Sequence, residues 1–204
     1  MSDLLGLLSG IIFLPVPFIY FRQIKQGGST PHPITWLIAL AVLTLNTFTY
    51  HDVVKGNWFK TTLPIVITVA MFFLVAYSFT KRKFGPIGKS GIITMVFALI
   101  SFTYWFITRN NQQTNIVLQI SLLVAWWPTL EGLLKGTLRE KPLSWAISAL
   151  AYSLLVASNI LNYQGLLPLL YPFVNGFLGN LSVAIIAFLR NRKTQISEFS
   201  QEPV

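Results

Sequence analysis

The chain has 204 residues, of which 53% are hydrophobic and 10% are charged, and its mean hydropathy is +0.62. Soluble domains carry about 25% charged residues, so this composition indicates a membrane protein. The net charge of +9 does not indicate a partner nucleic acid, because Lys and Arg occur in short clusters between apolar runs. Since the chain has no Cys, disulfides, thiolate catalysis and cysteine metal ligands are excluded.

Seven apolar runs approach the roughly 20 residues that a helix needs to cross a bilayer. They cover residues 4–21, 34–51, 61–80, 90–108, 114–134, 143–161 and 166–189. We expect the first run to be retained as a span, because no basic residue precedes it as in a signal peptide. The fold class predicted is therefore an all-α membrane protein with seven transmembrane helices, and the lipid bilayer is its first expected partner.

The basic residues predict the orientation of these spans. Of the 15 Lys and Arg residues, twelve fall on one side of the alternating loops and three on the other. The three are Lys55, Lys60 and Arg109. Because short cytoplasmic loops are enriched in Lys and Arg, we expect an extracytoplasmic N-terminus and a cytoplasmic C-terminus.

The chain also contains an internal repeat. Pro33-Ile34-Thr35-Trp36 recurs as Pro142-Leu143-Ser144-Trp145, and the basic cluster at 81–83 recurs at 190–193, both at an offset of 109 residues. One span separates the two copies, so both triplets cross in the same direction, and we expect two parallel three-helix bundles joined by a linker helix (3+1+3). The predicted parts are residues 1–83, the linker 84–113, residues 114–193 and a cytosolic tail 194–204.

Two segments carry a resemblance to a known family. Phe13-Leu14-Pro15-Val16-Pro17, continuing to Lys25 and Ser29-Thr30, and Pro172-Phe173-Val174-Asn175-Gly176 resemble the first-helix and last-helix signatures of the SWEET and PQ-loop (MtN3-saliva) transporter superfamily. The resemblance implies two three-helix bundles around a central solute pathway. The third span departs from the family pattern, because residues 61–80 contain no Asn.

Amides and aromatic side chains inside spans are the candidates for binding a solute. An unpaired amide is costly in hydrocarbon, so these residues should face other helices or a wet cavity. The predicted substrate-binding residues are Asn175, Asn159, Asn46, Trp126, Ser158 and Asn180. For Asn46 and Asn180, interhelical hydrogen bonding is an equally open reading. The repeat aligns Asn159 with Tyr50 or, with a four-residue insertion, with Asn46, and leaves this choice open.

Other residues are assigned to movement of the helices. Tyr50 and Asp52 are the predicted gate residues at the outer end of the second span, in keeping with the family resemblance. A solvated pair of His51 and Asp52 at the helix end is an equally open interpretation. Pro15, Pro17 and Pro128 each remove a helical hydrogen bond and are the predicted hinges. Glu131, the most membrane-embedded acid, is expected to pair with Lys135 at i+4.

The resemblance implies a transporter of a small neutral polar solute, with a sugar as the first choice. Because no span carries a carboxylate or His near its middle, we predict that transport is facilitated and uncoupled from protons. A vitamin, nucleoside or amino acid is the alternative cargo, and a seven-helix ligand receptor is a weaker one. No enzymatic activity, cofactor or metal site is predicted, because no nucleophile with a base and no metal-ligand spacing occurs within the spans. The sequence is compatible with a homo-oligomer.

Overall fold

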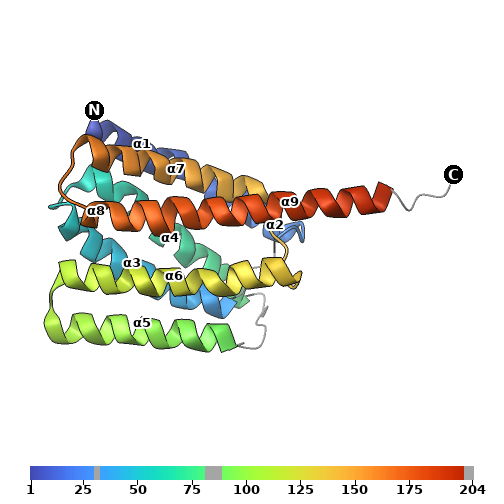
Figure 1. Cartoon of the computed structure of the whole chain (residues 1–204), viewed down its shortest axis with the longest axis horizontal. Coiled ribbons are helices and arrows are strands. Elements are labelled where there is room, and N and C mark those ends of the chain that lie inside the picture. The colour runs from blue at the N-terminus through green and yellow to red at the C-terminus, as the bar shows by residue number, and fades with distance from the viewer. Residues whose placement is uncertain (30–32, 81–88, 200–204) are drawn as a thin grey trace.

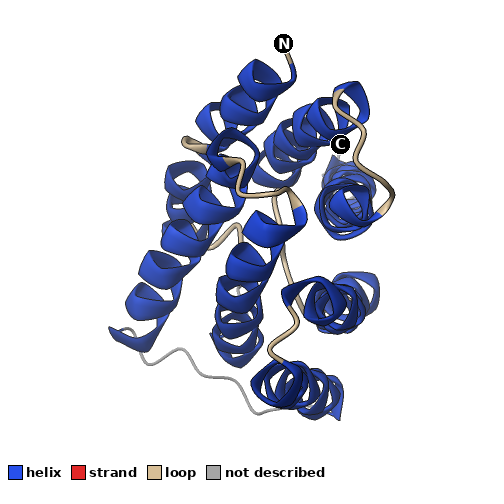
Figure 2. Ribbon diagram, turned by 90° about the vertical axis from the view of Figure 1, so that its left-hand side faces the viewer, coloured by secondary structure: helices blue, strands red, loops and turns tan. Residues whose placement is uncertain are grey.

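The computed structural model describes residues 1–29, 33–80 and 89–199, and these form helices joined by short loops without any strand (Figures 1 and 2). The helices are α1 (Ser2–Phe13), α2 (Val16–Lys25), α3 (Pro33–Val53), α4 (Trp58–Thr80), α5 (Lys89–Thr108), α6 (Asn111–Lys135), α7 (Pro142–Leu161), α8 (Leu167–Leu169), the π-helix η1 (Leu170–Leu178) and α9 (Gly179–Phe199). The basic triplet at 81–83, the boundary at 83–84 and residues 200–204 lie outside the described residues.

Among the described residues, six helices are long and apolar enough to cross a membrane. They comprise α1 with α2, then α4, α5, α6 and α7, and finally α8 to α9 taken together, Leu167–Arg192. The helix α3 also has 21 residues, but its second half is more polar, with Asn46, Thr49, His51 and Asp52. The membrane-like, all-helical class predicted from composition is therefore confirmed. Each predicted run coincides with one helix or, for the first and last runs, with consecutive helices.

Prolines interrupt the spans in different ways. The first span divides at Leu14 and Pro15, where α1 ends and α2 begins. The helix α6 continues without interruption through Pro128, as α4 does through Pro64. The last span widens into the π-helix η1, which begins two residues before Pro172. Since π-turns occur frequently at functional sites, the side chains on η1 are candidates for a functional site.

The helices pack as a bundle whose two ends differ in charge. The helix α1 packs against α4 and α7, α3 against α4 and α6, and η1 and α9 against α6 and α7, while α5 lies at the edge against α6 (Figure 1). The ends of α2 and α6 and the starts of α5 and α7 lie at one end of the bundle, which we call the basic face, with Arg22, Lys25, Lys89, Lys135 and Lys141. The start of α1 lies at the opposite end (Figure 1).

Close approach between α1 and α4 depends on small residues. A Cβ atom on Gly6 would lie 2.9 Å from the backbone oxygen of Phe59, and one on Gly10 would lie 2.4 Å from a methyl carbon of Thr62. Without a hydrophobic driving force between helices in lipid, such close packing is a principal source of helix association.

We expect Gly6→Val to destabilise the bundle by about 1–3 kcal/mol, because the backbone of α4 cannot move aside as a flexible side chain would. The measurement is thermal unfolding of the purified full chain in detergent. Leu4→Val is the matched control, since Leu4 lies on the same helix and is 57% exposed. Equal melting temperatures for the two variants would contradict this account of the α1–α4 contact.

Candidate functional site

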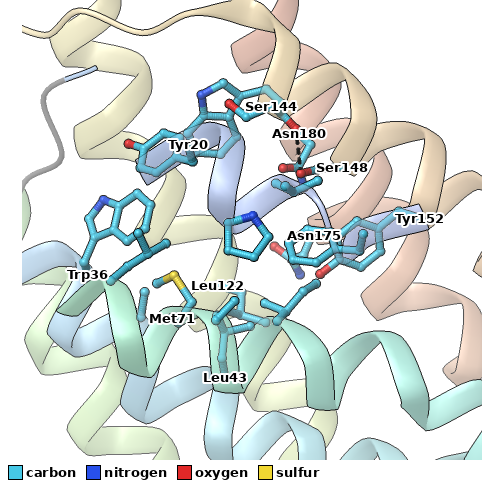
Figure 3. A pocket seen from close by; sticks show the side chains of 18 of the residues that line it. Tyr20, Trp36, Leu43, Met71, Leu122, Ser144, Ser148, Tyr152, Asn175 and Asn180 are labelled. Carbon is cyan, nitrogen blue, oxygen red and sulfur yellow. Dashed lines mark hydrogen bonds between the residues drawn. The ribbon is translucent and has the colours of Figure 1, made fainter. Parts of the chain in front are cut away.

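A cavity of about 160 Å³ lies inside the bundle, lined by α1, α2, α3, α4, α6, α7, η1 and α9. Figure 3 shows its labelled side chains, with Tyr20 and Trp36 on one side and Tyr152 and Asn175 on the other. Pockets for drug-sized ligands are typically about 300–1,000 Å³, so this cavity suits only a small solute. Its described lining contains no charged side chain.

Aromatic side chains form the wall of the cavity toward the basic face. The rings of Tyr20 and Trp36 stack with centroids 5.0 Å apart. The Trp145 ring lies edge-on to Tyr20 and to Trp126, at 5.8 Å from each. Trp36 and Trp145 are the fourth residues of α3 and α7, so the repeated Pro-x-Ser/Thr-Trp motif places one Trp from each copy on the cavity.

Four amides from three helices meet beside the cavity, and we call Asn46, Asn115, Gln119 and Asn175 the amide cluster. Asn175 Nδ2 donates to Gln119 Oε1 at 2.9 Å, and Gln119 Nε2 donates to Asn46 Oδ1 at 3.0 Å. Asn115 Nδ2 also donates to Asn46 Oδ1, at 3.2 Å. All four side chains are at most 6% exposed. The cluster therefore joins α3, α6 and η1 in the interior of the bundle.

Two atoms of the amide cluster are buried without a hydrogen-bond partner in the described structure, Asn46 Nδ2 and Asn175 Oδ1. Asn175 also lines the cavity. A buried polar atom without a partner costs free energy, so Asn175 Oδ1 is suited to accept a hydrogen bond from a molecule in the cavity.

A tyrosine cluster fills the bundle between the cavity and the face opposite the basic one. Tyr152 and Tyr171 hydroxyls lie 2.6 Å apart, and the Tyr171 ring lies edge-on to Tyr50 at 5.3 Å. Asn159 Nδ2 donates to the Tyr50 hydroxyl at 2.8 Å and to the Pro168 carbonyl at 3.0 Å. Tyr50 is 0% exposed and Asn159 is 1% exposed, so the described side chains are closely packed at this end of the bundle.

Two glycines allow aromatic rings to pack on the last span. A Cβ atom on Gly176 would lie 2.0 Å from the Tyr152 ring, and one on Gly179 would lie 2.4 Å from the Trp126 ring. The wide turn of η1 and these two glycines together hold Asn175 between the aromatic wall of the cavity and the tyrosine cluster.

The predicted site residues separate into two groups in the structure. Asn175, Asn180, Trp126 and Pro17 line the cavity. The others lie away from the lining. Asn46 belongs to the amide cluster, Asn159 and Tyr50 belong to the tyrosine cluster, and Ser158 is hydrogen-bonded to Ser2. Asp52 accepts a hydrogen bond from Asn111 at the surface, Pro15 lies between α1 and α2, and Pro128 lies within α6. The predicted pairing of Glu131 with Lys135 is confirmed, at 2.5 Å.

Sequence reasoning missed Asn115 and Gln119. Their spacing of four residues within an apolar run places both on one face of α6, which is the signal that could have identified them. It also missed the cavity-lining Tyr20, Trp36 and Trp145, because Trp near a helix end is also typical of a lipid interface. Among the described residues, no group of three His, Asp or Glu side chains could hold a metal ion.

Comparison with known proteins finds no match to a family model, to a curated protein or to a solved structure. The structure itself defines an all-helical, membrane-type bundle with an uncharged, aromatic internal cavity.

We expect Gln119→Ala to lower the free energy of unfolding by about 1–3 kcal/mol, because it leaves Asn175 and Asn46 without their shared partner in an apolar interior. Gln112→Ala is the control, since Gln112 is exposed on the same helix and its loss should change stability by less than about 0.5 kcal/mol. Combining Gln119→Ala with Asn175→Ala should cost less than the two single losses added together. Full additivity would show that the two amides are not coupled.

Proposed function

We propose that the chain is a membrane transporter that moves a small neutral polar solute by facilitated, uncoupled alternating access, with a sugar as the first candidate. The observation that carries the proposal is the buried, unpartnered Asn175 Oδ1 in an uncharged aromatic cavity. Such a site offers hydrogen bonding to a polar group and ring faces to C–H surface, and it binds no fixed charge.

The closed tyrosine cluster supports alternating access. Tyr50, Tyr152 and Tyr171 close one side of the cavity, while the cavity extends toward the basic face as far as Tyr20 and Trp36. If the basic face is cytoplasmic, as the positive-inside rule predicts, this arrangement corresponds to a state closed to the outside. Transport would then require the tyrosine cluster to separate.

The helix contacts support the 3+1+3 arrangement and the resemblance to the SWEET and PQ-loop superfamily. In the predicted repeat, α1 corresponds to α6, α3 to α7 and α4 to α9. The contact of α1 with α7 should therefore have a counterpart in the contact of α6 with α3, and both contacts are extensive. Likewise, α4 packs between α1 and α3, and α9 packs between α6 and α7. Tyr50 and Asn159, which align across the repeat at an offset of 109, hydrogen-bond to each other, as residues near a pseudo-two-fold axis would.

A second candidate cargo is a nucleoside or a nucleoside-like vitamin. The seven aromatic side chains on the described cavity lining favour a solute with a flat face: Phe13, Tyr20, Trp36, Trp126, Trp145, Tyr152 and Tyr171. A zwitterionic amino acid is disfavoured, because the described lining has no counter-charge for it.

Uptake into proteoliposomes tests the proposal with a panel of labelled sugars, nucleosides and amino acids. We expect one neutral class to equilibrate without a proton gradient and Asn175→Ala to reduce its flux at least tenfold, because the free Oδ1 acceptor is lost. Asn162→Ala is the matched control, since Asn162 is exposed at the end of α7 and should leave flux unchanged. Accumulation that depends on a proton gradient would overturn uncoupled transport, and no flux for any compound would favour a receptor.

The hinge hypothesis predicts that Pro17→Ala and Pro128→Ala slow the flux of whichever solute is carried. Pro128→Ala restores a backbone hydrogen bond inside α6, and Pro17→Ala restores an N–H at the second residue of α2 that can bond back across the break after α1. Pro64→Ala is the control, because it is the same change inside α4, a helix outside the hinge set. Native rates in both hinge variants, with normal insertion, would rule out these prolines as hinges.

A further inference from the structure

A buried carboxyl group lies directly behind the aromatic wall of the cavity. Glu140 precedes α7 in the loop at the basic face and is only 3% exposed. The Tyr20 hydroxyl donates to Glu140 Oε1 at 2.9 Å, and Trp145 Nε1 donates to Oε2 at 3.1 Å. We call these three residues the latch.

The latch joins parts of the chain that are far apart in sequence. Tyr20 comes from α2, 120 residues before Glu140, and Trp145 comes from the first turn of α7. On α9, Asn191 Nδ2 donates to the backbone carbonyl of Glu140 at 3.2 Å. The carboxyl group is therefore held where the first, sixth and seventh predicted spans meet at the basic face.

The same two side chains that bind Glu140 also face the cavity. Tyr20 and Trp145 line it, and the Tyr20 ring stacks on Trp36 (Figure 3). Loss of the hydrogen bonds to Glu140 would free both rings from their common anchor. A change at the carboxyl group is thus transmitted directly to the wall that separates the cavity from the basic face.

Burial sets the protonation behaviour of Glu140. Loss of hydration raises the pKa of its carboxyl group to about 7, and hydrogen bonds from Trp145, Tyr20 and Ser29 offset only part of this rise. The donors Tyr20 and Trp145 are uncharged, whereas the Glu131 carboxylate pairs with the charged Lys135.

Three of the cations near the latch contact other groups. The Arg190 guanidinium on α9 donates to the Leu133 and Leu138 carbonyls at 2.7 and 3.0 Å, and Lys25 Nζ on α2 lies 4.6 Å from the Phe21 ring centroid. The stem of Lys141 packs on Gly28. Among the side chains that the structure describes, the remaining charged groups on these elements are Arg22 on α2, Arg139 beside Glu140 in the loop and Arg192 on α9.

We propose that Glu140 is a proton-binding site that regulates passage between the cavity and the basic face, with the protonated form holding the latch closed. The proposal rests on the proposed transport function and specifies its regulation. On release, the O–H bond of the carboxyl group breaks, the proton passes to water at the basic face, and the hydrated carboxylate withdraws from Tyr20 and Trp145.

Linkage gives the direction of the pH effect. The latched carboxyl group has its pKa near 7, whereas a hydrated Glu has a pKa of about 4.3. The closed latch therefore binds the proton more tightly than the open form. Its stabilisation is fully present below about pH 4.3 and is lost as the pH rises through 7, and the closed-to-open ratio falls about tenfold per pH unit between these limits.

Cysteine accessibility tests the proposal without any solute. The chain has no Cys, so Ser148→Cys places a single thiol on the cavity lining, where Ser148 is 4% exposed. Thr137→Cys, at an exposed loop position, gives the reference rate and corrects for titration of the thiol itself. Both variants of the full chain are labelled with a membrane-impermeant thiosulfonate in nanodiscs at pH 5 to 8.

We expect the ratio of the Ser148→Cys to the Thr137→Cys labelling rate to rise steeply with pH, at least tenfold across this range, and to become flat when Glu140→Gln is added. Glu131→Gln is the matched control on the same face and should leave the rise unchanged. Tyr20→Phe provides a second variant: it removes a hydrogen bond that lowers the pKa, so the midpoint should move to higher pH.

The proposal would be overturned if the ratio of labelling rates did not change with pH when Glu140 is present. It would also be overturned if the pH-dependent rise persisted in Glu140→Gln. A Tyr20→Phe midpoint that stays in place or moves to lower pH would also count against it. Because labelling requires no cargo, failure of the transport assay with a normal pH response would reject the proposed function alone.

Discussion

The pairing of the four buried amides is the interaction on which the interior depends. An amide that is buried in an apolar surrounding loses its hydrogen bonds to water. If no protein group replaces them, the loss destabilises the fold. Gln119 meets this requirement for its neighbours, since it receives Asn175 Nδ2 on its oxygen and donates to Asn46 from its nitrogen. Gln119 therefore links α3, α6 and η1, and Asn115 adds a second hydrogen bond from α6 to Asn46. Asn175 Oδ1 remains buried without a hydrogen-bond partner in the described structure.

The wide turn of η1 connects the amide cluster to the tyrosine cluster and to the aromatic wall of the cavity. Tyr171 and Asn175 are four residues apart on this segment, so one reaches the tyrosine cluster while the other reaches Gln119. Gly176 leaves the space that the Tyr152 ring occupies, and Gly179 does the same for Trp126. A substitution at either glycine would therefore disturb the closed side of the cavity or its aromatic wall, without touching a solute.

Composition and apolar run length predicted the helices because a bilayer demands long apolar segments whatever their partners are. Asn175 and Trp126 could be placed at the cavity because they stood within recognisable segments. Asn115 and Gln119 could not be placed so easily, because the family pattern directed attention to the third span, whereas these amides occur on α6. Glu140 looked like an ordinary loop residue, since burial of a loop carboxyl depends on Tyr20 and Trp145, which only the tertiary structure brings to it.

A titratable group near the pathway does not by itself make transport proton-coupled. Coupling requires a group that meets both aqueous faces in turn, with its protonation linked to the solute at each. Glu140 lies beyond the aromatic wall at the basic face, and the cavity and the tyrosine cluster of Tyr50, Tyr152 and Tyr171 lie between it and the other face. Its proton therefore exchanges with one face only. In the proposed transporter, such a site would change how readily one side opens, while the free-energy difference that drives the solute would still come from the solute gradient alone.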